Sequence, residues 1–385
     1  METATVTNGA SIELEPAVDI PSSCNHYYLN MGPQHPSTHG VLRVLLEMDG
    51  EYVVEAQPVL GYGHRMHEKM AEHKTWMAFM PNTGRMDYAA ALPYNHGYVS
   101  LFERLCGIEV PARAEYIRVI TSELNRIVSH HLWLGAFLLD LGAFTPILYT
   151  FDDREQVLDI LEDVTGSRLT YCYYRVGGVC KDIDDKFVER TRAFIKRQRE
   201  RFKVYNELVT GNIIFLKRVE GVGIITPEMA RRYGVTGPVL RGSGIAYDIR
   251  KAEPYSVYDK FDFEIPVGKT GDSLDRYLVR LEEMEQSLRI IEQALDQLPE
   301  GPYLGKVPKK LKLPTGDSSF AVEAARGELT YYLVSGGGDI PYRLKIRVPS
   351  YSNLSVLPEL GKGLLIADLV AAMGSLDLVI PEIDR

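Results

Sequence analysis

Two histidines in a turn-rich stretch are the first candidates for chemistry. His35 and His39 lie within residues 30–40, where two prolines and two glycines exclude a helix or a central strand. Alternating apolar residues over 41–48 and 52–56, with an Asp-Gly turn between them, predict a β-hairpin. The loop would carry two imidazoles at the end of a rigid scaffold, where they could exchange protons near neutral pH. Histidines in such loops more commonly form hydrogen bonds with backbone groups of the loop itself.

All nine histidines lie at or before His131, so any histidine chemistry belongs to the first third of the chain. The residues after Gly63 predict a helix that begins near residue 64 and carries His64, Glu68 and Glu72 on one face. This order differs from the H-E-x-x-H pattern of zinc helices. Carboxylates and imidazoles at helical spacing more often form a salt-bridged or solvated face, so we predict no metal site here.

A tyrosine and a carboxylate in apolar sequence surroundings complete the set of candidates. Asp87 and Tyr88 end a loop and are predicted to lie in the first turn of the next helix. Residues 113–142 form a long helix candidate with a wide apolar stripe, and Asp140 interrupts its apolar end. A carboxylate in such surroundings requires a partner. A structural ion pair at the helix end is the alternative to a functional role.

Composition restricts the class of protein. The chain has 385 residues, 45% of them hydrophobic and 25% charged, which is ordinary for a globular protein. A net charge of −9 argues against nucleic acid as the main partner. The four cysteines lack C-x-x-C spacing, which favours a reducing compartment and no cysteine-held cluster; they are Cys24, Cys106, Cys172 and Cys180. No signal peptide is visible, and the uncharged run 127–139 is too short to span a bilayer.

Periodicity predicts an α+β protein with a helical core. Helices are expected over 154–165, 184–209, 272–298 and 363–373, with loops and short helices over 210–271. A second β-hairpin is expected over 329–334 and 342–348, with Gly336–Gly338 as its turn. We expect four segments: a flexible tail over 1–20, a β region over 21–62, a helical core over 63–300 and a C-terminal hairpin and tail over 301–385.

The stretch from Met31 to Arg43 resembles the signature of the 49-kDa (D-type) subunit of respiratory complex I, the proton-pumping NADH:quinone oxidoreductase. Further matches follow in order along nearly the whole chain. They include His64-Arg65, Arg85-Met86-Asp87-Tyr88, Leu139-Asp140-Leu141-Gly142-Ala143, Leu240-Arg241-Gly242-Ser243-Gly244, Asp275-Arg276-Tyr277 and Gly374-Ser375-Leu376-Asp377. That family is similar in fold to the large subunit of [NiFe] hydrogenases, so the resemblance implies a hydrogenase-like fold.

The resemblance also indicates what occupies the former metal pocket. A nickel-iron site needs four thiolates from two C-x-x-C-type motifs near the two ends of the chain. This sequence has neither motif: its last cysteine is Cys180, and its tail reads Ser375-Leu376-Asp377. Residues 85–88 stand roughly where the first motif would lie. In the complex I family, the corresponding cavity receives the quinone headgroup.

By the same resemblance, His39 and Tyr88 are expected to hydrogen-bond the quinone, with His35 in the same loop, and Asp140 is expected to pair with His39. Reducing a quinone by two electrons takes two protons, which an imidazole (pKa about 6.5) and a phenol (pKa about 10) can supply. Arg65 is expected near the terminal 4Fe-4S cluster of a neighbouring subunit. The quinone could be ubiquinone or menaquinone.

The family further implies partners and a location. The partners are the terminal-cluster (B-type), C-type and membrane-arm H-type subunits, at the cytoplasmic face of the bacterial inner membrane, with no transmembrane segment in this chain. The alternatives are a related complex fed by F420H2 or ferredoxin, and a non-catalytic scaffold. Two positions depart from the family pattern: Met66 stands where many relatives have glycine, and Thr170 where some carry a histidine linked to a pH-dependent cluster potential.

Overall fold

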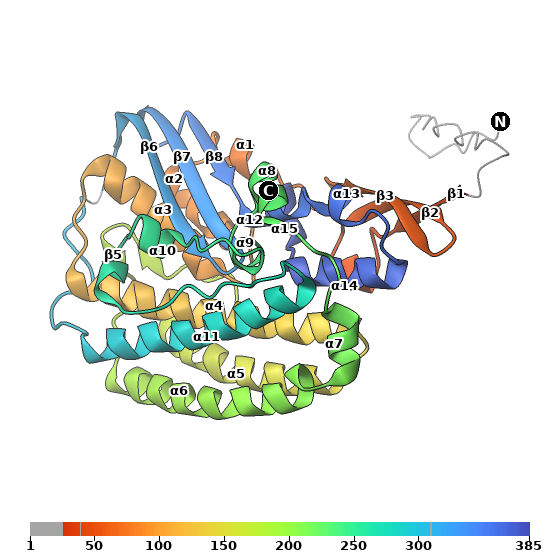
Figure 1. Cartoon of the computed structure of the whole chain (residues 1–385). Coiled ribbons are helices and arrows are strands. Elements are labelled where there is room, and N and C mark those ends of the chain that lie inside the picture. Colours follow the sequence, from red (N-terminus) through yellow and green to blue (C-terminus); the bar gives the residue numbers. More distant parts are fainter. Residues whose placement is uncertain (1–25, 39, 309) are drawn as a thin grey trace, which may run out of the picture.

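Four long helices form one layer of the fold. The computed structural model describes residues 26–38, 40–308 and 310–385. In it α4 packs against α5 and α11, and α6 packs against α5 and α11, so the four close into a bundle (Figure 1). Their bounds are Ala112–Asp140 for α4, Thr145–Thr165 for α5, Asp185–Tyr205 for α6 and Ser273–Asp296 for α11.

Sequence periodicity located these helices well because each buries a long apolar stripe. The expected single helix over 113–142 is α4, and Asp272 caps α11 by accepting the Asp275 N–H. Two ends differ from expectation. Helix α5 begins at Thr145 rather than Arg154, and α6 gives way to a π-helical turn, Asn206–Thr210, within the stretch expected to be α-helical.

An antiparallel sheet covers α3 (Ala91–Cys106) above the bundle (Figure 1). Its strands are β6 (Leu313–Ala324), β7 (Gly327–Gly338) and β8 (Arg343–Arg347). The expected hairpin is β7 and β8. However, the prediction that Gly336–Gly338 forms its turn is wrong: these glycines extend β7, where Gly336 pairs with Thr315. The prediction failed because it did not include their partner strand, β6.

A second antiparallel sheet lies at the other end of the molecule (Figure 1). Its strands are β1 (His26–Met31), β2 (Arg43–Asp49) and β3 (Tyr52–Val59), in that order. The predicted hairpin of β2 and β3 is confirmed, and β1 was not predicted. The loop from β1 to β2 contains the short 3-10 helix η1, Pro36–Thr38, which packs against α14 (Ile366–Leu376).

The predicted helix that begins near residue 64 and carries Glu68 and Glu72 is wrong in its bounds. The chain forms α1 over His67–Ala71 and a separate α2 over Trp76–Thr83. Met66 adopts a left-handed conformation (φ 53°), which no helix can continue through, and Thr75 caps α2. Asp87 and Tyr88 lie before α3 rather than in its first turn.

Short elements connect these layers and build the C-terminal region. They are β4 Tyr174–Arg175, β5 Gly178–Val179, α7 Ile213–Val219, α8 Pro227–Arg232, α9 Pro238–Gly242, α10 Ile249–Ala252, η3 Tyr258–Lys260, α12 Pro349–Leu354, α13 Leu357–Leu360 and α15 Ile380–Asp384. The expected loop-rich region over 210–271 is therefore confirmed, whereas α15 was not predicted. The predicted helix over 363–373 is α14, displaced by three residues.

Two large apolar cores hold the layers together. One joins α3, α4, α11 and the β6–β8 sheet, and the other joins the N-terminal sheet to the C-terminal helices. Within the described residues, no helix is both long and apolar enough to cross a membrane. The architecture is α+β, as expected. The division into four segments stays a prediction, and its 1–20 tail lies outside the described residues.

Candidate functional site

Tyr88 stands on a short segment whose neighbouring residue is anchored in the interior. The Tyr88 side chain is 39% exposed, whereas Asp87 is fully buried. Asp87 Oδ1 accepts the N–H groups of Ala89 and Ala90, each at 3.1 Å. These bonds fix the backbone just before α3 begins, so the aspartate points inward while the tyrosine ring stays accessible.

Arg326 joins this segment to the end of α14. It lies in the tight turn between β6 and β7, and its Nη1 donates to Asp87 Oδ2 at 2.7 Å. Its Nη2 donates to Asp377 Oδ1 at 3.0 Å, and its Nε donates to the Asp377 carbonyl at 3.1 Å. Burial alone would lower the pKa of Arg326, but the carboxylates of Asp377 and Asp87 raise it. The guanidinium is therefore a permanent positive charge between two chain segments.

The electrostatics keep the Tyr88 phenol protonated. Burial raises the pKa of Tyr88, Asp87 and Asp377 raise it further, and Arg326 opposes them. The phenol therefore keeps its proton at neutral pH and can donate it to a bound acceptor.

Asp140 is the last residue of α4 and lies beside the same end of α14. A Cβ atom on Gly374 of α14 would lie 3.6 Å from Asp140 Oδ2 and 2.9 Å from the ring of Phe137. The indole N–H of Trp133 donates to the Gly374 carbonyl at 2.8 Å. Glycine thus allows the two helices to approach closely at the site of the predicted carboxylate.

The histidine loop contacts α14 through η1 and α15 through Gly40. Thr38 is buried, and its hydroxyl donates to the His35 carbonyl at 2.7 Å. A Cβ on Gly40 would lie 3.3 Å from Ile380. The exposed His35 ring accepts the Ser37 N–H at 3.2 Å through Nδ1, a local role of the kind noted for loop histidines. His39 lies outside the described residues, so its expected pairing with Asp140 stays a prediction.

The residues around Arg65 form ion pairs. Arg65 is exposed just before α1, and burial, with added repulsion from Arg65 and His64, lowers the pKa of His67 to about 4. The Glu68 carboxylate is 3.0 Å from Arg343 and 3.1 Å from Lys345, which is the salt-bridged face we favoured. Among the residues that the structure describes, no cluster of His, Cys, Asp and Glu is arranged to hold a metal ion.

Two of the predicted site residues therefore border residues 374–377. Tyr88 is tied there through Asp87 and Arg326, and Asp140 lies against Gly374. Sequence reasoning missed the bridging role of Arg326, for which the sequence carries no local signal. Sequence reasoning identified Gly374–Asp377 only because this stretch matches the family. That match was the signal that the C-terminal end of α14 lies at the candidate site.

An accessible phenol and a carboxylate thus border the C-terminal end of α14 in an α+β chain with no membrane-spanning helix among its described residues. Residues 140–312 and 305–385 match the family model described as respiratory-chain NADH dehydrogenase, 49 Kd subunit.

Curated relatives extend this match over most of the chain. The D subunit of NADH-quinone oxidoreductase from Syntrophobacter fumaroxidans is 63% identical over 360 residues, which are 93% of this chain and 96% of the relative. Its counterpart in Desulfotalea psychrophila is 61% identical over 93% of this chain and 97% of its own length, and that of Geobacillus kaustophilus is 50% identical over 92% and 97%. The chain belongs to the family of the 49-kDa, or D-type, subunit of NADH-quinone oxidoreductase.

Proposed function

We propose that this chain forms the quinone headgroup site of a proton-translocating NADH:quinone oxidoreductase. In this proposal, Tyr88 and His39 hydrogen-bond the two quinone oxygens, Asp140 pairs with His39, and His35 lies at the rim of the same loop. The observation that carries the proposal is the Arg326 bridge between Asp87 and Asp377. It unites residues 85–88 and 374–377, the two segments in which a hydrogenase-like relative would hold its metal-binding cysteines. The hydrogenase-like fold itself stays part of the proposal.

The proposed chemistry needs two proton donors close to the substrate. Reduction to the quinol adds two electrons and two protons, one proton to each carbonyl oxygen. The Tyr88 phenol, which keeps its proton at neutral pH, supplies one of them, and the His39 imidazolium supplies the other. Asp140 would stabilise the charged imidazole before transfer, and both donors are then reprotonated from water.

The electrons come from outside this chain. We propose that their source is a 4Fe-4S cluster in a neighbouring B-type subunit, and that the exposed Arg65 faces that subunit. The C-type subunit and the membrane-arm H-type subunit complete the surroundings, at the cytoplasmic face of the bacterial inner membrane. In this proposal, His39, Tyr88 and Asp140 bind the substrate and move its protons.

Replacing Tyr88 by phenylalanine tests the proposal. In the assembled complex, Tyr88→Phe removes the phenol proton but keeps the ring, so subunit content should stay normal while quinone reduction falls about 10²-fold. Tyr332→Phe is the matched control, because Tyr332 is 41% exposed on β7 and has no place in the proposed site. Normal turnover of Tyr88→Phe with native-like quinones would contradict the assignment.

Two other functions make different predictions. A scaffold subunit would bind no quinone, so inhibitor-sensitive quinone binding to the assembled complex separates it from the proposed role. A complex fed by F420H2 or ferredoxin would contain the same quinone site but a different input module. The subunits that copurify with this chain identify the donor, and with it the quinone-reducing complex.

A further inference from the structure

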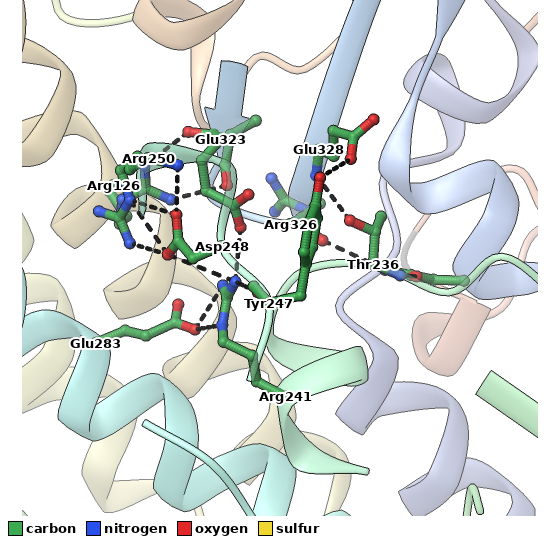
Figure 2. Close-up of polar contacts among 12 residues, drawn as sticks. Arg126, Thr236, Arg241, Tyr247, Asp248, Arg250, Glu283, Glu323, Arg326 and Glu328 are labelled. Atoms are coloured by element: carbon green, nitrogen blue, oxygen red, sulfur yellow. Dashed lines mark hydrogen bonds and ion pairs between the residues drawn. The ribbon is translucent and has the colours of Figure 1, made fainter. Parts of the chain in front are cut away.

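A group of charged side chains lies buried between α4, α11, β6 and residues 241–250 (Figure 2). Direct contacts join all of them, and none exposes more than 3% of its surface. We call this set the buried ion cluster: it consists of Arg126, Arg241, Arg250, Glu123, Asp248, Glu283 and Glu323.

The charges of the buried ion cluster do not balance. Within the cluster, four carboxyl groups face three guanidinium groups. The buried Arg280 also faces Glu283, but Asp377, outside the cluster, is its stronger carboxylate neighbour. Full ionisation would therefore leave one excess negative charge in the cluster. His130 contacts Glu283 at 3.1 Å, but burial lowers the pKa of His130, so its imidazole does not supply the missing positive charge. An uncompensated buried charge is costly, and a proton on one carboxyl group removes that cost.

Hydrogen bonds show which carboxylates are well satisfied. Glu123 accepts from two arginines and from the hydroxyl groups of Tyr258 (2.7 Å) and Ser287 (2.7 Å). Asp248 accepts several N–H groups of Arg250, at 2.6–3.3 Å. The guanidinium groups lower the pKa of Glu123 to about 2 although its burial acts in the opposite direction. These carboxyl groups are ionised at neutral pH.

Glu323 is the least satisfied carboxyl group. Its Oε1 accepts one hydrogen bond, from Arg241 Nη1 at 2.9 Å. Its Oε2 is buried and has no hydrogen-bond partner within residues 26–38, 40–308 and 310–385. By contrast, Glu283 receives both Arg241 Nε (2.7 Å) and His130. A proton on Oε2 of Glu323 therefore displaces no existing hydrogen bond among the described residues.

The surroundings of Glu323 favour its protonated form. Burial raises the pKa of Glu323 to about 7, and Asp248 raises it as well, whereas Arg241, Arg250 and Arg126 oppose the shift. The other groups that face it are polar or already paired. They are the Tyr255 hydroxyl, which accepts the Glu323 N–H, Tyr247 at the cluster's edge, and Glu123 on α4.

We infer that Glu323 is a buried proton-binding site, whose Oε2 carries the one proton that the excess carboxyl group of the buried ion cluster requires. Binding and release involve only that proton, so Glu323 changes between a neutral acid and a carboxylate with no other bond made or broken. The proton leaves as the pH rises through neutrality.

The position of Glu323 suggests what this proton responds to. Glu323 lies near the end of β6, and the turn that follows carries Arg326, which holds Asp87 next to Tyr88. Negative charge that arrives at Tyr88 during quinone reduction would raise the proton affinity of Glu323 through the buried Asp87–Arg326 pair. This coupling rests on the proposed function, whereas the proton-binding site does not.

Infrared difference spectroscopy of the assembled complex tests the site. On raising the pH from 5 to 9, the wild-type complex should lose the C=O band of a protonated carboxyl group. Glu323→Gln should abolish this band. The matched control Glu359→Gln, whose partly exposed carboxylate on α13 pairs with Arg232, should keep it. If Glu323→Gln does not assemble, Glu323→Asp keeps the acid and should shift the band. A wild-type complex without the band, or a band unaffected by these Glu323 variants, would overturn the inference.

Spectra of NADH-reduced against oxidised complex at pH 7 test the coupling. The Glu323 band should gain intensity on reduction, and it should do so only when quinone is present. A pH-dependent band that is insensitive to reduction would overturn the coupling and leave the proton-binding site intact. Full turnover of Tyr88→Phe together with a normal pH titration of the band would contradict the proposed function alone.

Discussion

Asp87 Oδ2 and Arg326 Nη1 lie 2.7 Å apart, although 239 residues separate them in the sequence. Both side chains are buried, and Arg326 also holds Asp377. One guanidinium therefore determines how the segment that carries Tyr88 lies relative to the end of α14. The position of Tyr88 relative to residues 374–377 therefore depends on this contact rather than on either segment alone.

Replacing Arg326 by glutamine should disturb the site more than the rest of the fold. Breaking a buried pair leaves Asp87 and Asp377 without their counter-charge, which costs about 3–5 kcal/mol. Amide hydrogen exchange in the assembled complex should show lost protection over residues 85–90, and quinone reduction should fall. Arg192→Gln is the control, because the exposed pair of Arg192 with Asp296 contributes about 1 kcal/mol or less. Equal protection in both variants would show that the bridge does not position Tyr88.

The parts of the fold that sequence reasoning found are those specified by local patterns. Helices α4 and α11 and the hairpin of β2 and β3 bury a periodic apolar face, so their own residues predict them. Strands β1 and β6 were not predicted, because their pairing depends on a partner elsewhere in the chain. The glycine run after Ser335 was misread for the same reason: without β6, a glycine-rich stretch indicates a turn.

The candidate site divides in a similar way. Family motifs predicted Tyr88 and Asp140, and the structure brings both to the end of α14. No pattern predicted that Arg326, in an ordinary tight turn, would bridge two distant carboxylates. A contact of this kind depends on tertiary packing, and a single sequence carries no signal for it.

Gly374 offers a test of Asp140 that leaves every titratable group in place. In Gly374→Ala, the new Cβ would lie 2.9 Å from the Phe137 ring and 3.6 Å from Asp140 Oδ2, so the Phe137 ring or the two helices must shift beside Asp140. Overpacking of this kind costs about 1–3 kcal/mol. Quinone reduction should fall while assembly persists. Gly336→Ala is the control, because no atom of the described residues lies within 4 Å of the Cβ that this alanine would add. Unchanged turnover in Gly374→Ala would separate Asp140 from catalysis.

Met66 has a backbone conformation that suits glycine better. It is exposed and left-handed (φ 53°, ψ 38°), a conformation that costs a residue with a side chain about 1–2 kcal/mol. Met66→Gly removes this cost in the folded state. Glycine also increases the backbone entropy of the unfolded chain, so the net stabilisation should be at most about 1 kcal/mol.

Hydrogen-exchange protection over residues 64–72 measures that gain in the assembled complex. The matched control is Met77→Gly, a similarly exposed methionine inside α2, which should lose about 1 kcal/mol. A loss of protection in both variants would mean that the Met66 side chain contributes contacts that outweigh its backbone cost.

His67 should make this same region sensitive to acid. Burial lowers its pKa to about 4 from the 6.5 of an unfolded chain, so the unfolded state binds a proton between these values and the folded state does not. Titration of His67 therefore does not lower the free energy of unfolding above pH 6.5, but it lowers this free energy as the pH decreases toward 4. His67→Leu removes this dependence and also keeps an apolar contact with Phe79, whose ring centroid lies 6.4 Å away. Protection factors over residues 64–72 measure the stability difference between His67→Leu and wild type. This difference should favour the variant by about 2 kcal/mol more at pH 5 than at pH 8. An identical difference at the two pH values would show that His67 titrates alike in the folded and unfolded chain.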